Sequence, residues 1–287
     1  MTPRKDLHEA NRLSWNEATK AHNSHKADQA GFLRAGGGTL FPEEVELLGD
    51  LHGKRLLHLQ CNSGQDSLSL ARRVATVTGV DISDEAIAFA RQLSAGSGIA
   101  ATFHRADVFD WLEEAAARGE RFDVVFSSYG VIGWLSDLRA WARGIAGVLG
   151  PGGRFVLVEF HPFAWTLDEE GTGKLTYPYS TGGEALTWDE GVGDYVARSG
   201  GALSPSGHEE GVVGFRNPHP VHGFPWGLGD ILGALLDAGL VIETFREYPY
   251  ANGCRLFEGM RELPGRRMYP PEGMPSLPLM FGLAARR

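Results

Sequence analysis

Between residues 55 and 160 the chain alternates short apolar runs with longer amphipathic segments. The short runs have the length of buried strands, and the longer segments repeat their apolar positions at helical spacing. The predicted strands are 56–59, 75–80, 101–104, 122–127 and 154–160, and the predicted helices are 66–73, 84–93 and 137–149. Because strand–helix–strand units close through right-handed crossovers, this alternation predicts an α/β fold with a doubly wound parallel sheet.

The segment 164–225 interrupts this pattern with a different composition. It contains twelve Gly, seven aromatic residues, nine acidic residues and only three basic ones. The alternating runs 185–188 and 211–215 predict hairpins. Since a structureless connection of this length is unusual inside a compact domain, we expect a β-rich insertion there. After residue 225 the pattern resumes with a predicted helix at 228–238 and strands at 240–248 and 279–285.

Composition and charge limit the partners. A formal net charge of −9 argues against a polyanion as the main partner, so we expect no nucleic acid. No run of about 18 apolar residues occurs, and the N-terminus lacks the apolar core of a secretory signal, so we expect no membrane partner. Two cysteines are too few for a disulfide framework, which is typical of a reducing cytoplasm.

Polar residues close four successive predicted strands. The turn 60–64 follows the first strand, Asp81 ends the second, Asp107 the third and Ser127 the fourth. The carboxyl ends of parallel strands meet at one edge of the sheet, where ligands bind. Asp81 stands 17 residues after Gly64, close to the roughly 20-residue spacing of a carboxylate that accepts ribose hydroxyls. The four positions predict a nucleoside pocket, although Asp81 could also be only a helix cap.

These motifs resemble those of class I S-adenosylmethionine-dependent methyltransferases. Gln60-Cys61-Asn62-Ser63-Gly64 stands at the family's glycine-rich motif, Gly79–Ser83 is similar to its ribose motif, and Arg105–Val108 to its adenine motif. The final strand resembles the family's antiparallel last strand. The resemblance implies a Rossmann-like, mostly parallel seven-stranded sheet and S-adenosylmethionine as cofactor. The chain departs from the family pattern at His58, Gln60 and Asn62, where an acidic residue and two glycines are usual.

The resemblance also implies a division of the chain and roles for its residues. We expect a helical lid at 1–40, the methyltransferase domain at 41–163 and 226–287, and the insertion at 164–225. A solvated amphipathic helix is the alternative for the lid, which contains Trp15, His22 and His25. The expected cofactor-binding residues are Gln60, Cys61, Asn62, Ser63, Gly64, Asp81, Ile82, Asp107, Val108 and Ser127.

Methyl transfer is an in-line displacement that depends mainly on alignment, and a base is needed only if the nucleophile loses a proton. His161, directly after the fifth strand, is the preferred base candidate, and Tyr129 is a second. A purely structural role for His161 remains an alternative. We expect no metal, because His208, His219 and His222 fit no compact zinc pattern.

Two other functions stay open. A nicotinamide-dependent oxidoreductase would share the acidic second-strand end, but the turn lacks the G-x-G-x-x-G glycines that admit a pyrophosphate. A catalytically degenerate fold that serves as a binding or interaction module would explain the altered glycine motif. The identity of the small-molecule acceptor, the attacked atom and the oligomeric state do not follow from the sequence.

Overall fold

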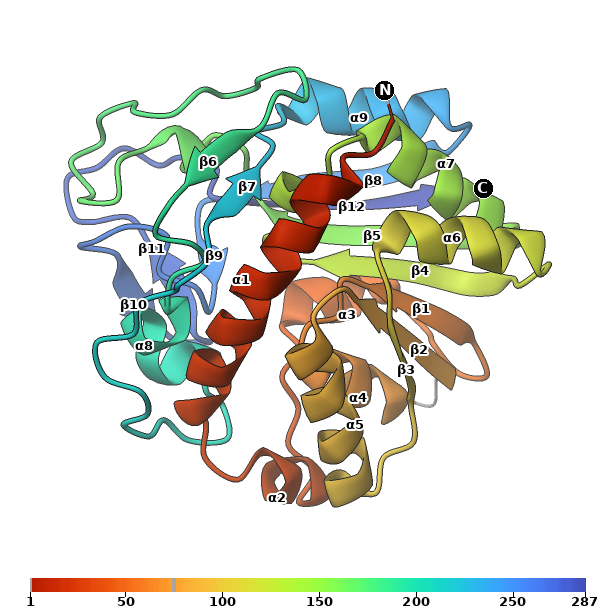
Figure 1. Ribbon diagram of the computed structural model, residues 1–287, viewed down its shortest axis with the longest axis horizontal. Coiled ribbons are helices and arrows are strands. Elements are labelled where there is room, and N and C mark those ends of the chain that lie inside the picture. Colours follow the sequence, from red (N-terminus) through yellow and green to blue (C-terminus); the bar gives the residue numbers. More distant parts are fainter. Residues whose placement is uncertain (1, 74–75) are drawn as a thin grey trace.

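A seven-stranded sheet forms the centre of the computed structural model, which describes residues 2–73 and 76–287. The strand order is β3-β2-β1-β4-β5-β12-β8, and only β12 runs antiparallel to its neighbours (Figure 1). The strands are β1 Arg55–Leu59, β2 Thr76–Asp81, β3 Thr102–Arg105, β4 Phe122–Ser128, β5 Leu149–Phe160, β8 Val241–Tyr248 and β12 Met280–Arg286. The predicted fold class is confirmed, while Ala75, at which the predicted second strand begins, lies outside the described residues.

The central strands are largely apolar on both faces because helices cover both, whereas the edge strands β3 and β8 are mostly exposed. Neighbouring residues of one strand enter different cores: Leu57 packs with α6, α7 and α9, and Leu56 packs with α3 and α4. These helices, together with α5 beside β2 and β3, form two layers around the sheet (Figure 1). Their bounds are α3 Pro42–Leu48, α4 Gln65–Ala71, α5 Asp84–Ser97, α6 Val108–Ala117, α7 Leu138–Val148 and α9 Leu228–Asp237.

The segment 164–225 contains less β-structure than predicted. Its one ladder pairs β6 Leu186–Trp188 with β7 Val221–Gly223, and the predicted strand at 211–215 is wrong. Val212 and Val213 in that run are exposed, so no buried face stabilises a strand there. The rest is loop with three short helices, η2 Ala164–Thr166, α8 Tyr195–Ser199 and η3 Gly200–Leu203.

A small three-stranded sheet, which the sequence did not predict, stands between β8 and β12. Its strands are β9 Ala251–Asn252, β10 Arg261–Leu263 and β11 Arg267–Tyr269. Leu256 and Met268 from this region share a core with Phe160 at the end of β5 and Leu167 of the following segment. The small sheet therefore forms part of the wall above the carboxyl end of β5.

The N-terminal residues form α1 Lys5–Ser24 and α2 Gln29–Arg34. Helix α1 crosses in front of the strand ends, between the central sheet and the β6–β7 ladder (Figure 1). Among the described residues, no helix combines the length and the apolar character that a membrane span requires.

Candidate functional site

The turn from β1 into α4 keeps a left-handed backbone at the positions where its sequence is unusual. Gln60, Asn62 and Gly64 have φ angles of 52°, 47° and 77°. Left-handed backbone costs a non-glycine residue roughly 1–2 kcal/mol. Local hydrogen bonds offset part of this cost: Gln60 Nε2 donates to the Val131 carbonyl at 3.0 Å, and Asn62 Oδ1 accepts from the Ser63 N–H at 2.6 Å. The two substitutions relative to the family pattern therefore preserve the turn.

Asp81, at the end of β2, holds this turn against the sheet. Its Oδ2 accepts from the Asn62 N–H at 2.8 Å and its Oδ1 from the Ser83 N–H at 2.9 Å. Burial raises the pKa of the Asp81 carboxyl, although these backbone N–H groups oppose that rise. A carboxylate has about four lone-pair sites, so two hydrogen bonds leave room for a ligand. Asp81 lines a cavity at the strand ends.

Asp107 has two partners of its own. It caps α6 by accepting from the Phe109 N–H at 2.8 Å, and its other oxygen lies 2.7 Å from His8 Nδ1. The His8 imidazole stacks on Phe109 with a centroid distance of 5.3 Å. Both His8 and Asp107 line the cavity, and the sequence analysis missed His8.

A stripe along α1 faces the same cavity. Its members recur every three or four residues and therefore lie on one face of the helix. They are His8, Asn11, Trp15, Thr19 and His22, with Lys26 one step further along the chain. This spacing was the signal in the sequence that could have identified the whole stripe.

Side chains on the flanks of α1 fix it on both sides. On the sheet side, Asn16 Oδ1 accepts from the Ser83 hydroxyl at 2.8 Å, and Asn23 Nδ2 donates to the Ser63 hydroxyl at 2.8 Å. On the other side, His25 Nε2 lies 2.8 Å from the Asp194 carboxylate in the segment 164–225. These contacts hold α1 across the strand ends.

The cavity beneath α1, called here the inner cavity, has a volume of about 220 Å³. Ser63, Gly64 and Ser127 do not line it, although they were predicted to bind the cofactor. Ser63 bonds to Asn23, and Ser127 is fully buried in β4. The predicted residues that do line it are Gln60, Cys61, Asn62, Asp81, Ile82, Asp107 and Val108.

Three residues that line the inner cavity carry buried polar atoms without a hydrogen-bond partner among the described residues. The atoms are His8 Nε2, Thr19 Oγ1 and Gln60 Oε1. Buried polar groups in proteins are nearly always paired, and each one left unpaired costs about 1–3 kcal/mol. Their convergence on one enclosed space fits a polar ligand such as a nucleoside with an amino-acid tail.

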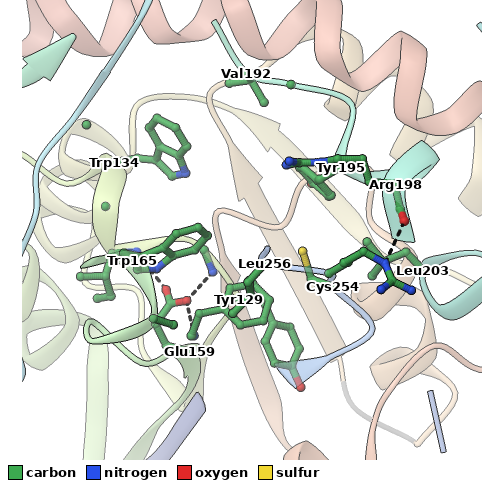
Figure 2. A pocket seen from close by; sticks show the side chains of 18 of the residues that line it. Tyr129, Trp134, Glu159, Trp165, Val192, Tyr195, Arg198, Leu203, Cys254 and Leu256 are labelled. Carbon is green, nitrogen blue, oxygen red and sulfur yellow. Dashed lines mark hydrogen bonds between the residues drawn. The ribbon is translucent and has the colours of Figure 1, made fainter. Parts of the chain in front are cut away.

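A second, larger cavity of about 1390 Å³, the outer cavity, adjoins the first. Figure 2 shows Trp134 and Trp165 on one side of it, Tyr195 and Cys254 on the other, and Tyr129 between them. Tyr177, Trp188 and Phe215 of the segment 164–225 also line it. The residues that line both cavities are Trp15, Lys26, Gln65, Asp66, Tyr129, Gly130, Trp134, Tyr195 and Leu203.

Glu159, near the end of β5, fixes the loop between the two cavities. Its carboxylate accepts four backbone N–H groups, those of Gly130, Val131, Ile132 and Phe160. Burial raises its pKa, while the four N–H groups act in the opposite direction. The sequence analysis did not select Glu159, whose role depends on the path of the loop it holds.

His161 lines neither cavity. The chain leaves β5 at Phe160 and turns, so that the imidazole packs against Phe281 and its Nε2 lies 3.1 Å from Glu247. Its preferred assignment as the base is therefore not supported by its position. The structural alternative accounts for its contacts.

Tyr129 lines both cavities, but its hydroxyl points to a buried polar cluster. The hydroxyl accepts from Asn252 Nδ2 at 2.9 Å. Burial, helped by the charge of Glu44, raises the pKa of Tyr129 well above its usual value. Such a phenol remains protonated at neutral pH, so Tyr129 is poorly suited to act as a base.

Lys26 is a site residue that the sequence analysis missed. It lines both cavities, and its ammonium makes no hydrogen bond or ion pair with any residue that the structure describes. Burial lowers its pKa to about 8, although the charge of Asp66 opposes this shift. An unpaired cation beside an enclosed site is a binding position for an anionic group.

No cluster of three potential metal ligands occurs among the described residues.

Comparison with known proteins agrees with this geometry. Residues 56–153 match the family described as a methyltransferase domain. The chain is 32% identical over 125 residues to a ubiquinone biosynthesis O-methyltransferase of Sodalis glossinidius, covering 43% of this chain and 49% of that protein. With the corresponding enzyme of Sinorhizobium fredii it shares 37% identity over 103 residues, which cover 36% and 40% of the two chains. The chain thus spans about half the length, or less, of these curated relatives.

Solved structures resemble nearly the whole chain. The CcbJ methyltransferase of Streptomyces caelestis superposes with a TM-score of 0.58 at 14% identity, covering 96% of this chain and 98% of that one. An S-adenosylmethionine-dependent methyltransferase of Mesorhizobium loti gives 0.54 at 20% identity, with 88% and 99% covered. At these identities the likeness shows the fold. Residues 56–153 thus resemble a methyltransferase domain, and the predicted resemblance to the class I family is confirmed.

Proposed function

We propose that the protein is an S-adenosylmethionine-dependent methyltransferase that binds its cofactor in the inner cavity and a small-molecule acceptor in the outer cavity. The observation that carries this proposal is the pair of adjoining cavities at the carboxyl ends of the strands. The inner one is lined by the methyltransferase motifs and unpaired polar atoms, and the outer one by many apolar and aromatic side chains. When bound, the cofactor supplies a methyl group on a positively charged sulfur.

The residues in and around the inner cavity have distinct roles toward the cofactor. Asp81 accepts hydrogen bonds from the ribose hydroxyls, and Ile82 packs on the adenine. His8, oriented by Asp107, faces the edge of the base. Lys26 takes the carboxylate of the methionine tail, and Gln60 Oε1 takes its amino group. Cys61 and Asn62 supply the turn surface, while Ser63, Gly64, Val108 and Ser127 shape the site around it.

The chain's own contribution to the reaction is enclosure and alignment. Helix α1 and the segment 164–225 cover the strand ends and exclude water, and the loop held by Glu159 separates the two sites. Holding two reactants in line can supply several kcal/mol of the barrier, on the order of 7–11 kcal/mol in well-oriented systems. We assign residues 1–40 as the lid, 41–163 and 226–287 as the methyltransferase domain, and 164–225 as the acceptor cover.

The outer cavity favours a large acceptor that carries rings. Its volume of about 1390 Å³ exceeds the ~300–1,000 Å³ of common ligand pockets, and its lining includes aromatic side chains from several segments. The relatives named ubiquinone biosynthesis O-methyltransferases make an oxygen nucleophile the first to test. Both cysteines are free and buried, which agrees with a reducing compartment, and we place the enzyme in the cytoplasm.

The altered glycine motif was the support for a binding module without activity. Because Gln60 and Asn62 adopt the left-handed backbone themselves, the altered residues do not distort the turn. The missing glycines continue to disfavour a dinucleotide, because the side chains in their place would crowd a pyrophosphate. Neither the inactive binding module nor the nicotinamide-dependent oxidoreductase is therefore needed to explain the altered motif.

Calorimetric titration with S-adenosylmethionine and S-adenosylhomocysteine tests the proposal. We expect micromolar binding of both by the wild type and its loss in Asp81→Ala. Asp189→Ala, which removes an exposed carboxylate outside the inner cavity, is the matched control and should bind normally. Absence of binding to the folded wild type would refute the proposal.

A further inference from the structure

Four aromatic residues line both cavities and come from four different segments. Trp15 belongs to α1, Tyr129 follows β4, Trp134 ends the short helix η1 Ile132–Trp134, and Tyr195 begins α8. No other aromatic side chain lines both cavities in the part of the chain that the structure describes. Aromatic rings therefore make up four of the nine residues at the boundary between the donor and acceptor sites.

Three of these rings form a connected group. The Trp15 and Trp134 centroids are 5.6 Å apart with an interplanar angle of 87°, and those of Trp15 and Tyr195 are 6.4 Å apart at 69°. Figure 2 shows Trp134 and Tyr195 on opposite sides of the pocket. Trp15 packs edge to face on both other rings, and His22 packs on Tyr195 with a centroid distance of 4.1 Å. The ring surfaces outside these contacts are the ones that line the two cavities.

The Tyr195 ring presents a neutral, unpaired hydroxyl. No described residue hydrogen-bonds to this hydroxyl, and burial raises its pKa above the usual value for tyrosine. Lys26 and Asp66 also border the boundary and carry opposite charges. The aromatic faces are thus the feature most able to distinguish a cationic ligand from a neutral one of the same shape.

We propose that Trp15, Trp134 and Tyr195 form an aromatic enclosure that recognises the positive sulfur of the methyl donor and binds the neutral product less well. This inference rests on the proposed function, since the transferred methyl group must face the acceptor and the sulfur must therefore lie at the boundary of the two cavities. Aromatic faces attract cations, more strongly where water is excluded. The reaction removes this charge, so the same rings weaken binding of the product.

The ratio of two dissociation constants tests the enclosure without any acceptor. S-adenosylmethionine and S-adenosylhomocysteine differ by one methyl group and the charge on sulfur. We expect the wild type to prefer the charged donor by ~10-fold, a size consistent with a desolvated cation–aromatic contact. Trp15→Leu should reduce this preference to about 2-fold by weakening donor binding alone.

Two further variants make the result specific. Trp165→Leu removes a ring that lines only the outer cavity and should leave the ratio unchanged. Trp15→Phe keeps an aromatic face and should retain most of the preference. If Trp15→Leu does not fold, as judged by circular dichroism, Trp134→Leu replaces it with the same expected loss.

The outcomes separate this inference from the proposed function. If the wild type binds neither ligand, the proposed function fails and the enclosure fails with it. If it binds both, but the leucine variants keep the wild-type ratio, the enclosure is refuted while the proposed function stands. A selective loss of donor binding in Trp15→Leu, absent in Trp165→Leu, supports the enclosure.

Discussion

His8 Nδ1 lies 2.7 Å from the Asp107 carboxylate, which connects the lid helix to the residue that follows β3. The pKa of the Asp107 carboxyl is lowered. Burial acts to raise this pKa, and the hydrogen bond from His8 is the largest of the effects that lower it. With Nδ1–H donated to this carboxylate, Nε2 of a neutral ring is an acceptor. It is also one of the unpaired atoms of the inner cavity. Helix α1 thus supplies an acceptor that can recognise an amine.

His8→Leu should therefore weaken recognition of the adenine amine. We expect ~10-fold weaker binding of S-adenosylhomocysteine, the usual loss for a buried hydrogen bond. Binding of S-inosylhomocysteine, whose base carries a carbonyl in place of the amine, should hardly change. Calorimetry on both ligands measures the difference, with the exposed His52→Leu as the control. Equal losses for the two ligands would contradict the assignment.

Lys26→Met tests the anion-binding role. It removes the ammonium while keeping much of the length of the side chain. We expect ~10-fold weaker binding of S-adenosylhomocysteine, because a charge-assisted contact is lost. Binding of 5′-methylthioadenosine, which lacks the amino-acid tail, should be unchanged. Lys20→Met, an exposed position on α1 that lines neither cavity, is the control. A parallel loss for both ligands would place Lys26 outside the tail site.

Much of the central sheet could be predicted from the sequence. Its central strands are buried on both faces and therefore appear as apolar runs, and the polar residues at their ends fall at one edge of the sheet. The rule that the ends of parallel strands meet at one edge correctly placed Gln60, Asp81 and Asp107 around one cavity. It depends only on the order of the strands and not on the path of distant segments.

The lid and the acceptor side could not be predicted in the same way. A polar stripe on a helix is the same in sequence whether it faces solvent or a cavity, so the role of α1 depends on what it covers. The loop 129–132 is fixed by Glu159, which is distant in sequence. The base assignment of His161 relied on its position after a strand, whereas its contacts are set by where the chain turns.

The left-handed backbone at Asn62 predicts an unusual response to substitution. Asn62→Gly should change the free energy of unfolding by less than about 1 kcal/mol, because relief of the left-handed cost offsets the lost hydrogen bond to the Ser63 N–H. Asn62→Val should destabilise the protein by about 2 kcal/mol, since a β-branched residue tolerates this conformation poorly. Chemical denaturation measures both values. A valine variant as stable as the glycine variant would be inconsistent with the observed turn.

His58 predicts loss of stability in mild acid. Burial lowers its pKa to about 4, and its Nδ1 lies 2.8 Å from the Ser67 hydroxyl. Between pH 6.5 and 4 the unfolded chain binds a proton that the folded protein does not. The contribution of His58 to the free energy of unfolding is therefore complete above pH 6.5, and it falls by about 3 kcal/mol as the pH drops to 4. Denaturation at several pH values should show a flatter profile for His58→Asn and an unchanged one for His52→Asn.

Glu159→Gln should show how far the boundary between the cavities depends on one carboxylate. Glutamine offers one acceptor oxygen, and its NH₂ group would face backbone N–H groups that now donate to Glu159. We expect a loss of about 3 kcal/mol in the free energy of unfolding, since buried donors become unpaired. Cofactor affinity should fall as well, because Gly130 and Trp134 border both cavities. Glu247→Gln, at a more exposed position beside His161, should cost less than about 1 kcal/mol. A Glu159→Gln variant that matches the wild type in both denaturation and cofactor titration would mean that the loop keeps its position without the carboxylate.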